Sequence, residues 1–320
     1  MKRFLFRVVV LGCLVISNTA CNSRTQTSET SRQEENYPLN LSDMHIRDPF
    51  ILANVADSTY YMHANSGKKS FLCYASKDLR RWKLCGESFR PDPDFWGEHD
   101  FWAPKVYRYR GHYYLLASFF SERYRRGISI FISDRPDCGF RPLVNAPITP
   151  KGWMCLDGTL YVDKDGQPWL IYAREWIEVQ IGEIYAQRLS DDLSHTIGEP
   201  LFLFKGSDAD WPGLITTGAQ TGVITNAPFI YTTDSGKLLL IWSSFCTNGE
   251  YAIGVGVSHS GELRGPWHQR SGAINDDGGH AMIFRDFQGS LLISYHTNEP
   301  PVQVILRPVR IQQEEVVFLN

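Results

Sequence analysis

Short apolar runs follow one another in pairs along most of this chain, and a turn separates the two runs of each pair. The first runs are RDPFI, WAPKV, LDGTL, NAPFI and GHAMI, and the second runs are YYMHA, YYLLA, PWLIYA, LLLIWS and LLISYH. Apolar and polar residues alternate often, and no stretch keeps the i, i+3, i+4 spacing of an amphipathic helix. The pattern therefore predicts an all-β protein built from hairpins.

The pairs recur about every 55 residues, which is the spacing of a repeat with several strands per unit. Self-similarity of this kind is typical of a β-propeller, and five units predict five blades around a central funnel-shaped cavity. The expected blades are 45–91, 100–150, 154–205, 220–270 and 278–320. The interval before the fourth blade is longer, and we expect its extra segment, KGSDADWPGLITTG, to form one wall of the funnel.

One position repeats at the start of every innermost strand. It is occupied by Asp48, Ala103, Asp157, Ala227 and His280. Radial symmetry directs these five residues toward one cavity, although Asp is depleted in strands and costly to bury without partners. Each Asp could cap a turn, but two at matched positions favour a site. Two carboxyl groups facing one cavity are what the cleavage of a glycosidic bond needs.

Composition and charge restrict the class of partner. The chain has 320 residues, of which 43% are hydrophobic, and a formal net charge of −3 without basic runs, so no electrostatic footprint for nucleic acid is present. Five cysteines fall in the predicted folded part. Their number is odd and no metal-ligand spacing occurs, although Cys73 and Cys85 of one blade could pair.

The N-terminus predicts export. Residues 1–21 have a basic start, a short apolar core and small residues before Cys21, which resembles a bacterial lipoprotein signal with lipidation at Cys21. An ordinary secretory signal cut near Ala20 is the alternative. Residues 22–39 are nearly free of apolar side chains and predict a flexible tether. We expect a membrane-anchored lipoprotein of a bacterial envelope, periplasmic or at the cell surface, with one monomeric propeller at 40–320.

The five strand openings, taken in order, resemble glycoside hydrolase family 43 over nearly the whole mature chain. The matching runs are Arg47-Asp48-Pro49-Phe50, Trp102-Ala103-Pro104, Leu156-Asp157-Gly158, Asn226-Ala227-Pro228-Phe229 and Gly279-His280-Ala281-Met282-Ile283-Phe284. The resemblance implies a five-bladed propeller and an inverting hydrolase that releases mostly arabinose or xylose. It implies Asp48 as the general base and Asp157 as the carboxylate that orients and tunes the general acid. His280 would face the central cavity, where it contacts a cation in some relatives, so a structural calcium is possible although no cofactor is required.

The fourth blade departs from the family pattern. The family usually carries Glu, the general acid, where this chain has Asn226, and an amide cannot deliver a proton near neutral pH. Another carboxyl could supply the proton, the leaving group could need none, or the protein could be a non-catalytic, glycan-binding propeller lipoprotein. Our leading substitute acid is Glu175, at the end of the hairpin that carries Asp157; it could equally be a salt-bridged residue of the rim. Weaker candidates are Glu98, Asp100 and Glu183.

The substrate-binding prediction comprises Trp102, Asn226, His280 and Arg307. Trp102 stands at the expected funnel mouth, where an indole face can stack on a sugar ring, and comparison with the family suggests Arg307 as a hydroxyl ligand. Trp153, Trp176 and Trp211 are weaker candidates, and Trp169 and Trp242 are expected in the core. The sequence thus predicts a glycosidase resembling α-L-arabinofuranosidases or β-xylosidases, with a carbohydrate substrate.

Overall fold

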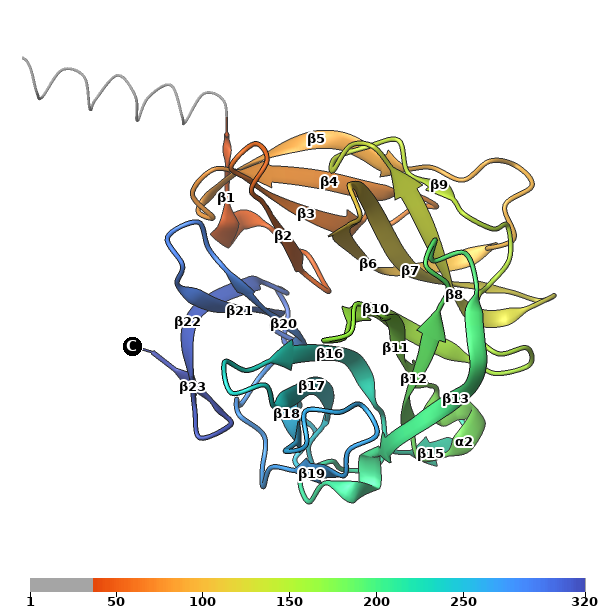
Figure 1. Cartoon of the computed structure of the whole chain (residues 1–320), viewed down its shortest axis with the longest axis vertical. Coiled ribbons are helices and arrows are strands. Elements are labelled where there is room, and N and C mark those ends of the chain that lie inside the picture. The colour runs from red at the N-terminus through yellow and green to blue at the C-terminus, as the bar shows by residue number, and fades with distance from the viewer. Residues whose placement is uncertain (1–36, 320) are drawn as a thin grey trace, which may run out of the picture.

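The computed structural model describes residues 37–319, and these residues form five antiparallel sheets arranged in a ring, together with a separate two-stranded sheet (Figure 1). The signal and lipidation predictions, and the tether prediction as far as residue 36, lie outside the described residues. Leu39, the last residue of the predicted tether, belongs to strand β1 and pairs with Trp82. The all-β, five-bladed prediction is confirmed. Blade one has the sheet order β1-β5-β4-β3-β2, and the other four blades follow chain order, each with four strands.

The strands of the first two blades are as follows. Blade one contains β1 (Leu39–Asn40), β2 (Phe50–Asn54), β3 (Thr59–Asn65), β4 (Phe71–Ser76) and β5 (Arg81–Phe89), with the 3-10 turn η1 (Leu41–Asp43). Blade two contains β6 (His99–Tyr109), β7 (His112–Ser121), β8 (Arg125–Ser133) and β9 (Arg141–Pro142).

The remaining blades and connections complete the ring. Blade three contains β10 (Cys155–Val162), β11 (Pro168–Arg174), β12 (Glu183–Leu189) and β13 (Thr196–Lys205). Blade four contains β16 (Asn226–Thr232), β17 (Leu238–Phe245), β18 (Tyr251–Ser258) and β19 (Trp267–Gln269), and blade five β20 (Gly279–Arg285), β21 (Leu291–His296), β22 (Val304–Gln312) and β23 (Glu315–Phe318). Within blade three, α2 (Trp176–Val179) connects β11 to β12. Between blades three and four lie η2 (Gly206–Asp208) and the hairpin of β14 (Ile215–Thr217) and β15 (Gln220–Gly222).

The long interval before blade four contains that separate hairpin. Blade four therefore starts at Asn226 rather than near Gln220. The hairpin is attached to the funnel side of blade three, because Gln220 donates to the carbonyl of Ile177 in α2 and Val223 donates to that of Gln180. Gly222 packs so closely that a Cβ there would meet Gln180 and the Trp176 ring.

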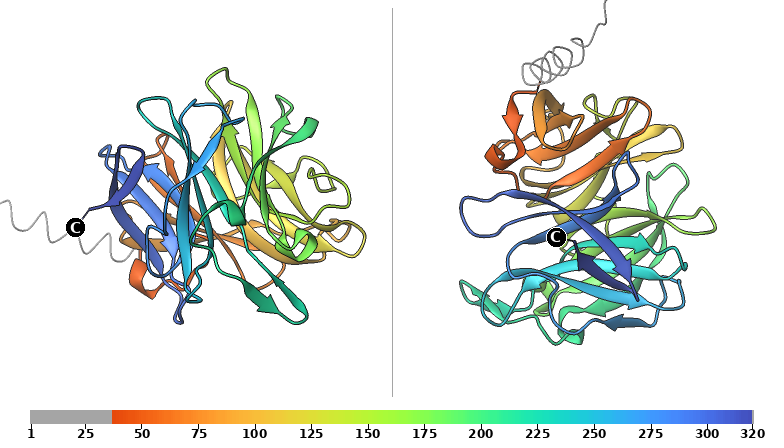
Figure 2. Two further views of the ribbon diagram at one scale, coloured as in Figure 1. Left: turned by 90° about the horizontal axis from the view of Figure 1, so that it is seen from below. Right: turned by 90° about the vertical axis from the view of Figure 1, so that its left-hand side faces the viewer.

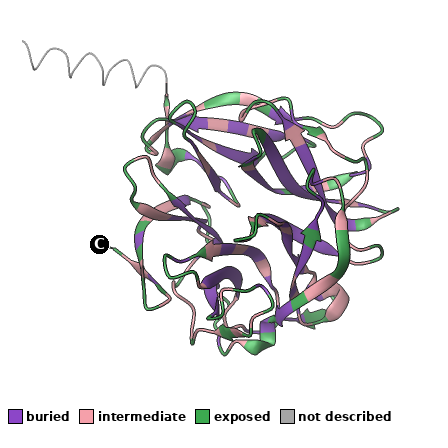
Figure 3. Cartoon of the chain, viewed as in Figure 1, coloured by how far each residue is buried: buried purple, intermediate pink, exposed green. Residues whose placement is uncertain are grey.

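The hydrophobic core consists of five clusters, one between each pair of neighbouring blades. The cluster between blades one and two, for example, joins Phe71 and Phe89 to Phe101, Phe119 and Phe131. Figure 3 shows the inner strands largely buried. Burial against both neighbours explains why these strands read as continuous apolar runs rather than as strict alternation.

Polar contacts between blades five and one contribute to closing the ring; these blades lie side by side in Figures 1 and 2. Ser294 donates to the carbonyl of Pro49, and the backbone amide of Phe287 donates to Tyr60. All five described cysteines are free, so Cys73 and Cys85 do not form a disulfide. Between residues 37 and 319, no helix has both the length and the apolar character needed to cross a membrane.

Candidate active site

The five repeated residues share an unusual backbone conformation. Asp48, Ala103, Asp157, Ala227 and His280 all have positive φ, between 50° and 60°. This left-handed region is uncommon for residues other than glycine. In β10, β16 and β20 the strand register shifts at this step, and such a bulge re-aims a side chain and is frequent beside active sites. The repeat is thus a left-handed backbone step that coincides with a bulge in several blades, and three of its five residues, Asp48, Asp157 and His280, line the central cavity.

The backbone amides of three of these residues are held by the blade before them. The amide of Asp157 donates to Ser118 Oγ at 2.9 Å, that of His280 to Ser243 Oγ at 2.9 Å and that of Asp48 to His296 Nδ1 at 3.1 Å. These three acceptors occupy equivalent positions on second strands, opposite the residue before the bulge of their own blade.

Blade three lacks such an acceptor, because Ala173 occupies the equivalent position. Instead, the amide of Ala227 donates to the Asp157 carboxylate, at 2.9 Å from Oδ2. Asp157 therefore helps to hold the fourth bulge as well as facing the cavity.

A cavity of about 780 Å³ opens at these bulges. Six of the seven predicted catalytic and substrate-binding residues line it, namely Asp48, Trp102, Asp157, Glu175, Asn226 and His280. Trp176, a weaker candidate, also lines the cavity. Arg307 does not: its guanidinium lies over the Phe318 ring, 4.4 Å from the centroid, in the outer half of blade five. Trp153 lies outside the cavity lining, and Trp211 packs in the core between blades three and four.

Asp48 is held as an ionised carboxylate. Burial alone would raise its pKa, but the charge and hydrogen bond of His280 outweigh that effect, and His296 and Lys105 add to them, so the pKa lies well below its usual value. His280 Nδ1 is 3.0 Å from Asp48 Oδ1. Burial lowers the pKa of His296 to about 4. A neutral imidazole can accept the Asp48 amide hydrogen through Nδ1.

The pKa of Glu175 is shifted in the opposite direction, upward from its usual value. Glu175 is largely buried between β11 and α2, and desolvation raises its pKa; Arg126 opposes this effect, while Asp157 and Asp100 reinforce it. Its Oε2 lies 3.0 Å from Arg126 Nε. Glu175 is therefore both a cavity residue and an ion-paired residue, which combines the two interpretations that the sequence left open.

Asn226 contacts the cavity without contributing a carboxyl group. Its side-chain amide donates to the Tyr251 hydroxyl at 3.4 Å. Burial raises the pKa of Tyr251, so this phenol stays protonated and is a poor proton donor for catalysis. The weaker acid candidates Glu98, Asp100 and Glu183 do not line the cavity.

Among the described residues, few side chains around His280 could serve as metal ligands. Its Nε2 is buried without a hydrogen-bond partner among the described residues. No group of three or more His, Cys, Asp or Glu side chains between residues 37 and 319 is placed to hold a metal. Calcium prefers six or more oxygen ligands, and a single imidazole nitrogen does not meet that preference. The calcium site stays a prediction.

Four further residues contact the site and were not singled out in the sequence: Arg126, Lys105, His296 and Tyr251. Lys105 stands in the motif WAPKV, and His296 ends the run LLISYH at the position where blades two and four have Ser118 and Ser243. Lys105 and His296 could therefore have been noticed in the sequence, because both stand at aligned positions of the repeat. Arg126 and Tyr251 lie on third strands, β8 and β18, whose sequence repeat is too weak to mark them.

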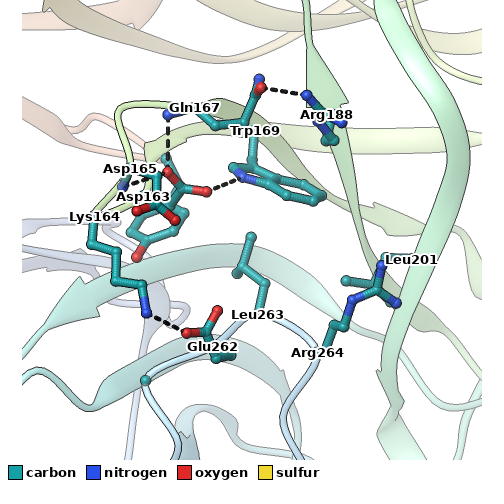
Figure 4. A pocket seen from close by; sticks show the side chains of 12 residues that line it. Asp163, Lys164, Asp165, Gln167, Trp169, Arg188, Leu201, Glu262, Leu263 and Arg264 are labelled. Atoms are coloured by element: carbon teal, nitrogen blue, oxygen red, sulfur yellow. Dashed lines mark hydrogen bonds and ion pairs between the residues drawn. The ribbon is translucent and has the colours of Figure 1, made fainter.

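A second depression, of about 480 Å³, lies at the other end of β10, between blades three and four (Figure 4). Its polar groups largely satisfy one another: Asp163 accepts from the Trp169 indole, Arg188 donates to Gln167, and Lys164 pairs with Glu262. Most of its charged side chains are therefore engaged with one another rather than directed at a ligand.

Comparisons with known proteins agree with this geometry. The model of "Glycosyl hydrolases family 43" matches residues 41–316. A solved structure described as an endo-arabinase from Bacteroides thetaiotaomicron VPI-5482 is 51% identical, covers 87% of this chain and 99% of its own, and superposes with a TM-score of 0.86. A thermostable family-43 glycoside hydrolase is 26% identical over 86% of this chain and 93% of its own, with a TM-score of 0.76. The extracellular exo-α-(1→5)-L-arabinofuranosidase ArbA of Cellvibrio japonicus is 22% identical over 75% of this chain and 71% of its own.

Proposed function

Because the chain belongs to glycosyl hydrolases family 43 and is a glycosidase, we propose that it hydrolyses α-L-arabinofuranosyl linkages of arabinan-type glycans by single displacement with inversion. In this proposal Asp48 is the general base and Glu175 the general acid. Trp102 provides a stacking face for the sugar, and Asn226 and His280 provide polar contacts.

The observation that carries the proposal is the contrast between Asp48 and Glu175. Both line one cavity, yet the pKa of Asp48 is lowered and that of Glu175 is raised. Two titratable groups whose environments push their pKa values apart are the signature of an acid and base pair. An inverting glycosidase needs such a pair on opposite sides of the sugar, with room for a water molecule at the base.

The surrounding residues support these roles. His280 holds Asp48 Oδ1 at 3.0 Å, which fixes the carboxylate that would activate the water. The negative charge of Asp157 is one of the causes that raise the pKa of Glu175 and so favours the protonated acid. As the leaving oxygen accepts the Glu175 proton, the resulting carboxylate would be stabilised by the Arg126 guanidinium beside it.

The substrate class rests on the relatives. The 51% identical structure is described as an endo-arabinase, and the curated relative as an extracellular exo-α-(1→5)-L-arabinofuranosidase. We extend arabinosyl specificity to this chain from these two. The extracellular relative and the N-terminal segment of this chain together support export, and we propose anchoring through a lipid on Cys21.

The test compares wild type, Asp48→Asn and Glu175→Gln on α-1,5-arabino-oligosaccharides and on aryl α-L-arabinofuranosides with a good leaving group, with aryl β-xylosides as the alternative substrate. Asp48→Asn should lose activity on every substrate. Glu175→Gln should lose on the order of 10² to 10⁴ in rate on oligosaccharides and far less on the aryl arabinosides, which need no proton donor. The first sugar released should have the opposite anomeric configuration, observed by NMR.

Three results would contradict the proposal. Equal losses for Glu175→Gln on both arabinosyl substrate types would remove Glu175 from the acid role. Faster turnover of xylosides than of arabinosides would overturn the substrate class. Binding of arabino-oligosaccharides without cleavage by wild type would favour a glycan-binding protein instead.

A further inference from the structure

A lysine lies beneath the cavity. Lys105, on the inner strand β6, is 3% exposed, although lysine is almost never buried this fully unless it is paired. Among the described residues no carboxylate lies within ion-pair distance of its ammonium group. Instead, Nζ donates to the carbonyl of Asp157 and to Thr159 Oγ1, both at 3.1 Å.

The contacts of Lys105 link three blades. Thr159, which accepts from Lys105, donates to the carbonyl of Pro228 at 2.5 Å. A chain of hydrogen bonds thus runs from blade two through blade three to blade four, beside the bulges that carry Asp157 and Ala227. Lys105 is not among the residues that line the cavity, so a bound sugar would not contact it.

The charge of Lys105 is coupled to the carboxyl groups above it. Burial lowers its pKa from 10.5 to about 8, while Asp157 on β10 and Asp48 before β2 act in the opposite direction. In return, Lys105 is one of the groups that lower the pKa of Asp48, together with His280 on β20 and His296 on β21. Near neutral pH the ammonium therefore carries its positive charge.

We infer that Lys105 is a positioning residue of this site: it holds the bulge that carries Asp157, and its buried ammonium places an internal positive charge beneath the cavity that contains the proposed base, Asp48. The inference rests on the proposed function, because it assigns Lys105 an effect on the proposed base. This role differs from a purely structural one. A neutral side chain of the same length would fill the space, but it would lack the positive charge that favours the ionised form of Asp48.

The first test replaces Lys105 with Met and follows the Asp48 carboxyl carbon by NMR in protein labelled at aspartate Cγ, with Asp48→Asn used for assignment. In wild type, Asp48 should remain ionised between about pH 4 and pH 8, so the titration is continued below pH 4, to the lowest pH at which the protein stays folded, to reach its midpoint. In Lys105→Met its midpoint should rise by on the order of one pH unit. The control, Thr159→Val, removes one hydrogen-bond partner and keeps the charge, so the Asp48 midpoint should stay as in wild type. An unchanged midpoint in Lys105→Met would overturn the inference.

A reciprocal measurement does not need a Lys105 variant to fold. Coupling between two titrating groups acts equally in both directions, so Asp48→Asn should lower the midpoint of the Lys105 ammonium, measured by its Nζ resonance. A Lys105 midpoint that does not respond to Asp48→Asn would also overturn the inference.

A third experiment measures kcat/KM on an aryl arabinofuranoside as a function of pH. The acid limb of this profile should lie at higher pH in Lys105→Met than in wild type. Absence of sugar release by wild type would count against the proposed function alone, because both NMR results stand without turnover.

Discussion

Replacing Arg126 by Met should move the alkaline limb of the pH profile to higher pH. Arg126 is buried between three partners: Nε lies 3.0 Å from Glu175 Oε2, Nη1 lies 2.9 Å from Asp100 Oδ2, and the guanidinium lies 4.0 Å from the Trp102 ring centroid. Its side chain is 7% exposed and that of Glu175 is 11% exposed. Solvent therefore screens this ion pair much less than a surface pair.

The expected magnitude follows from this geometry. Opposite charges about 3 Å apart attract by about 5 kcal/mol at an effective dielectric constant of about 20, which would correspond to an upper limit of about 4 pKa units. Relaxation reduces this, and a carboxyl beside an arginine typically shifts by about 1 to 3 units. Without Arg126 the pKa of Glu175 rises further, because burial, Asp157 and Asp100 then act without the opposing positive charge. Because a general acid works while protonated, activity is lost only as the pH passes the raised pKa.

The assay is kcat/KM on arabino-oligosaccharides across pH, for Arg126→Met and for the control Arg125→Met. Arg125 is the preceding residue of β8, and its described partners are a backbone carbonyl and a methionine sulfur rather than a carboxylate. Removing one partner of a buried ion pair costs about 3 to 5 kcal/mol of stability, so circular dichroism must confirm folding at the assay temperature. An alkaline limb that stays in place, or moves to lower pH, in folded Arg126→Met would refute Glu175 as the acid.

Two further predictions concern blade four and ring closure. Adding Asn226→Glu to Glu175→Gln should raise the oligosaccharide activity of Glu175→Gln roughly 10-fold or more, because the new carboxyl enters the same cavity. The control, Asn226→Gln in the same Glu175→Gln background, should restore no activity. Equal activities of the two double variants would contradict the prediction. His296, whose pKa burial lowers from 6.5 to about 4, binds its proton at higher pH in the unfolded chain. Its contribution to stability is therefore complete above about pH 6.5 and is lost as the pH falls toward about 4, by about 3 kcal/mol. Urea unfolding across this range should show a weaker pH dependence in His296→Gln than in wild type, and identical slopes would show that His296 does not titrate in this way.

The sequence predicts the architecture well because the repeat is a property of local hairpins. Once five inner strands are aligned, symmetry alone brings Asp48, Asp157 and His280 to one cavity, and the same alignment places Trp102 and Asn226 beside them. Arg307 could not be placed this way. It lies on a third strand, β22, where its guanidinium packs against Phe318. How far a third-strand side chain reaches toward the axis depends on tertiary packing, and for the same reason Arg126 on β8 was not identified.

The fourth blade shows why a motif can lose a residue without losing its chemistry. Protonation depends on the local environment, so a carboxyl from a neighbouring blade can take the acid role if burial and nearby charge raise its pKa. Here Asp157 connects the two blades: Oδ2 holds the amide of Ala227 next to Asn226, while its negative charge contributes to raising the pKa of Glu175. On the proposed mechanism, the proton donor has moved from blade four to blade three, and it remains under the influence of the carboxylate that the repeat places at the axis.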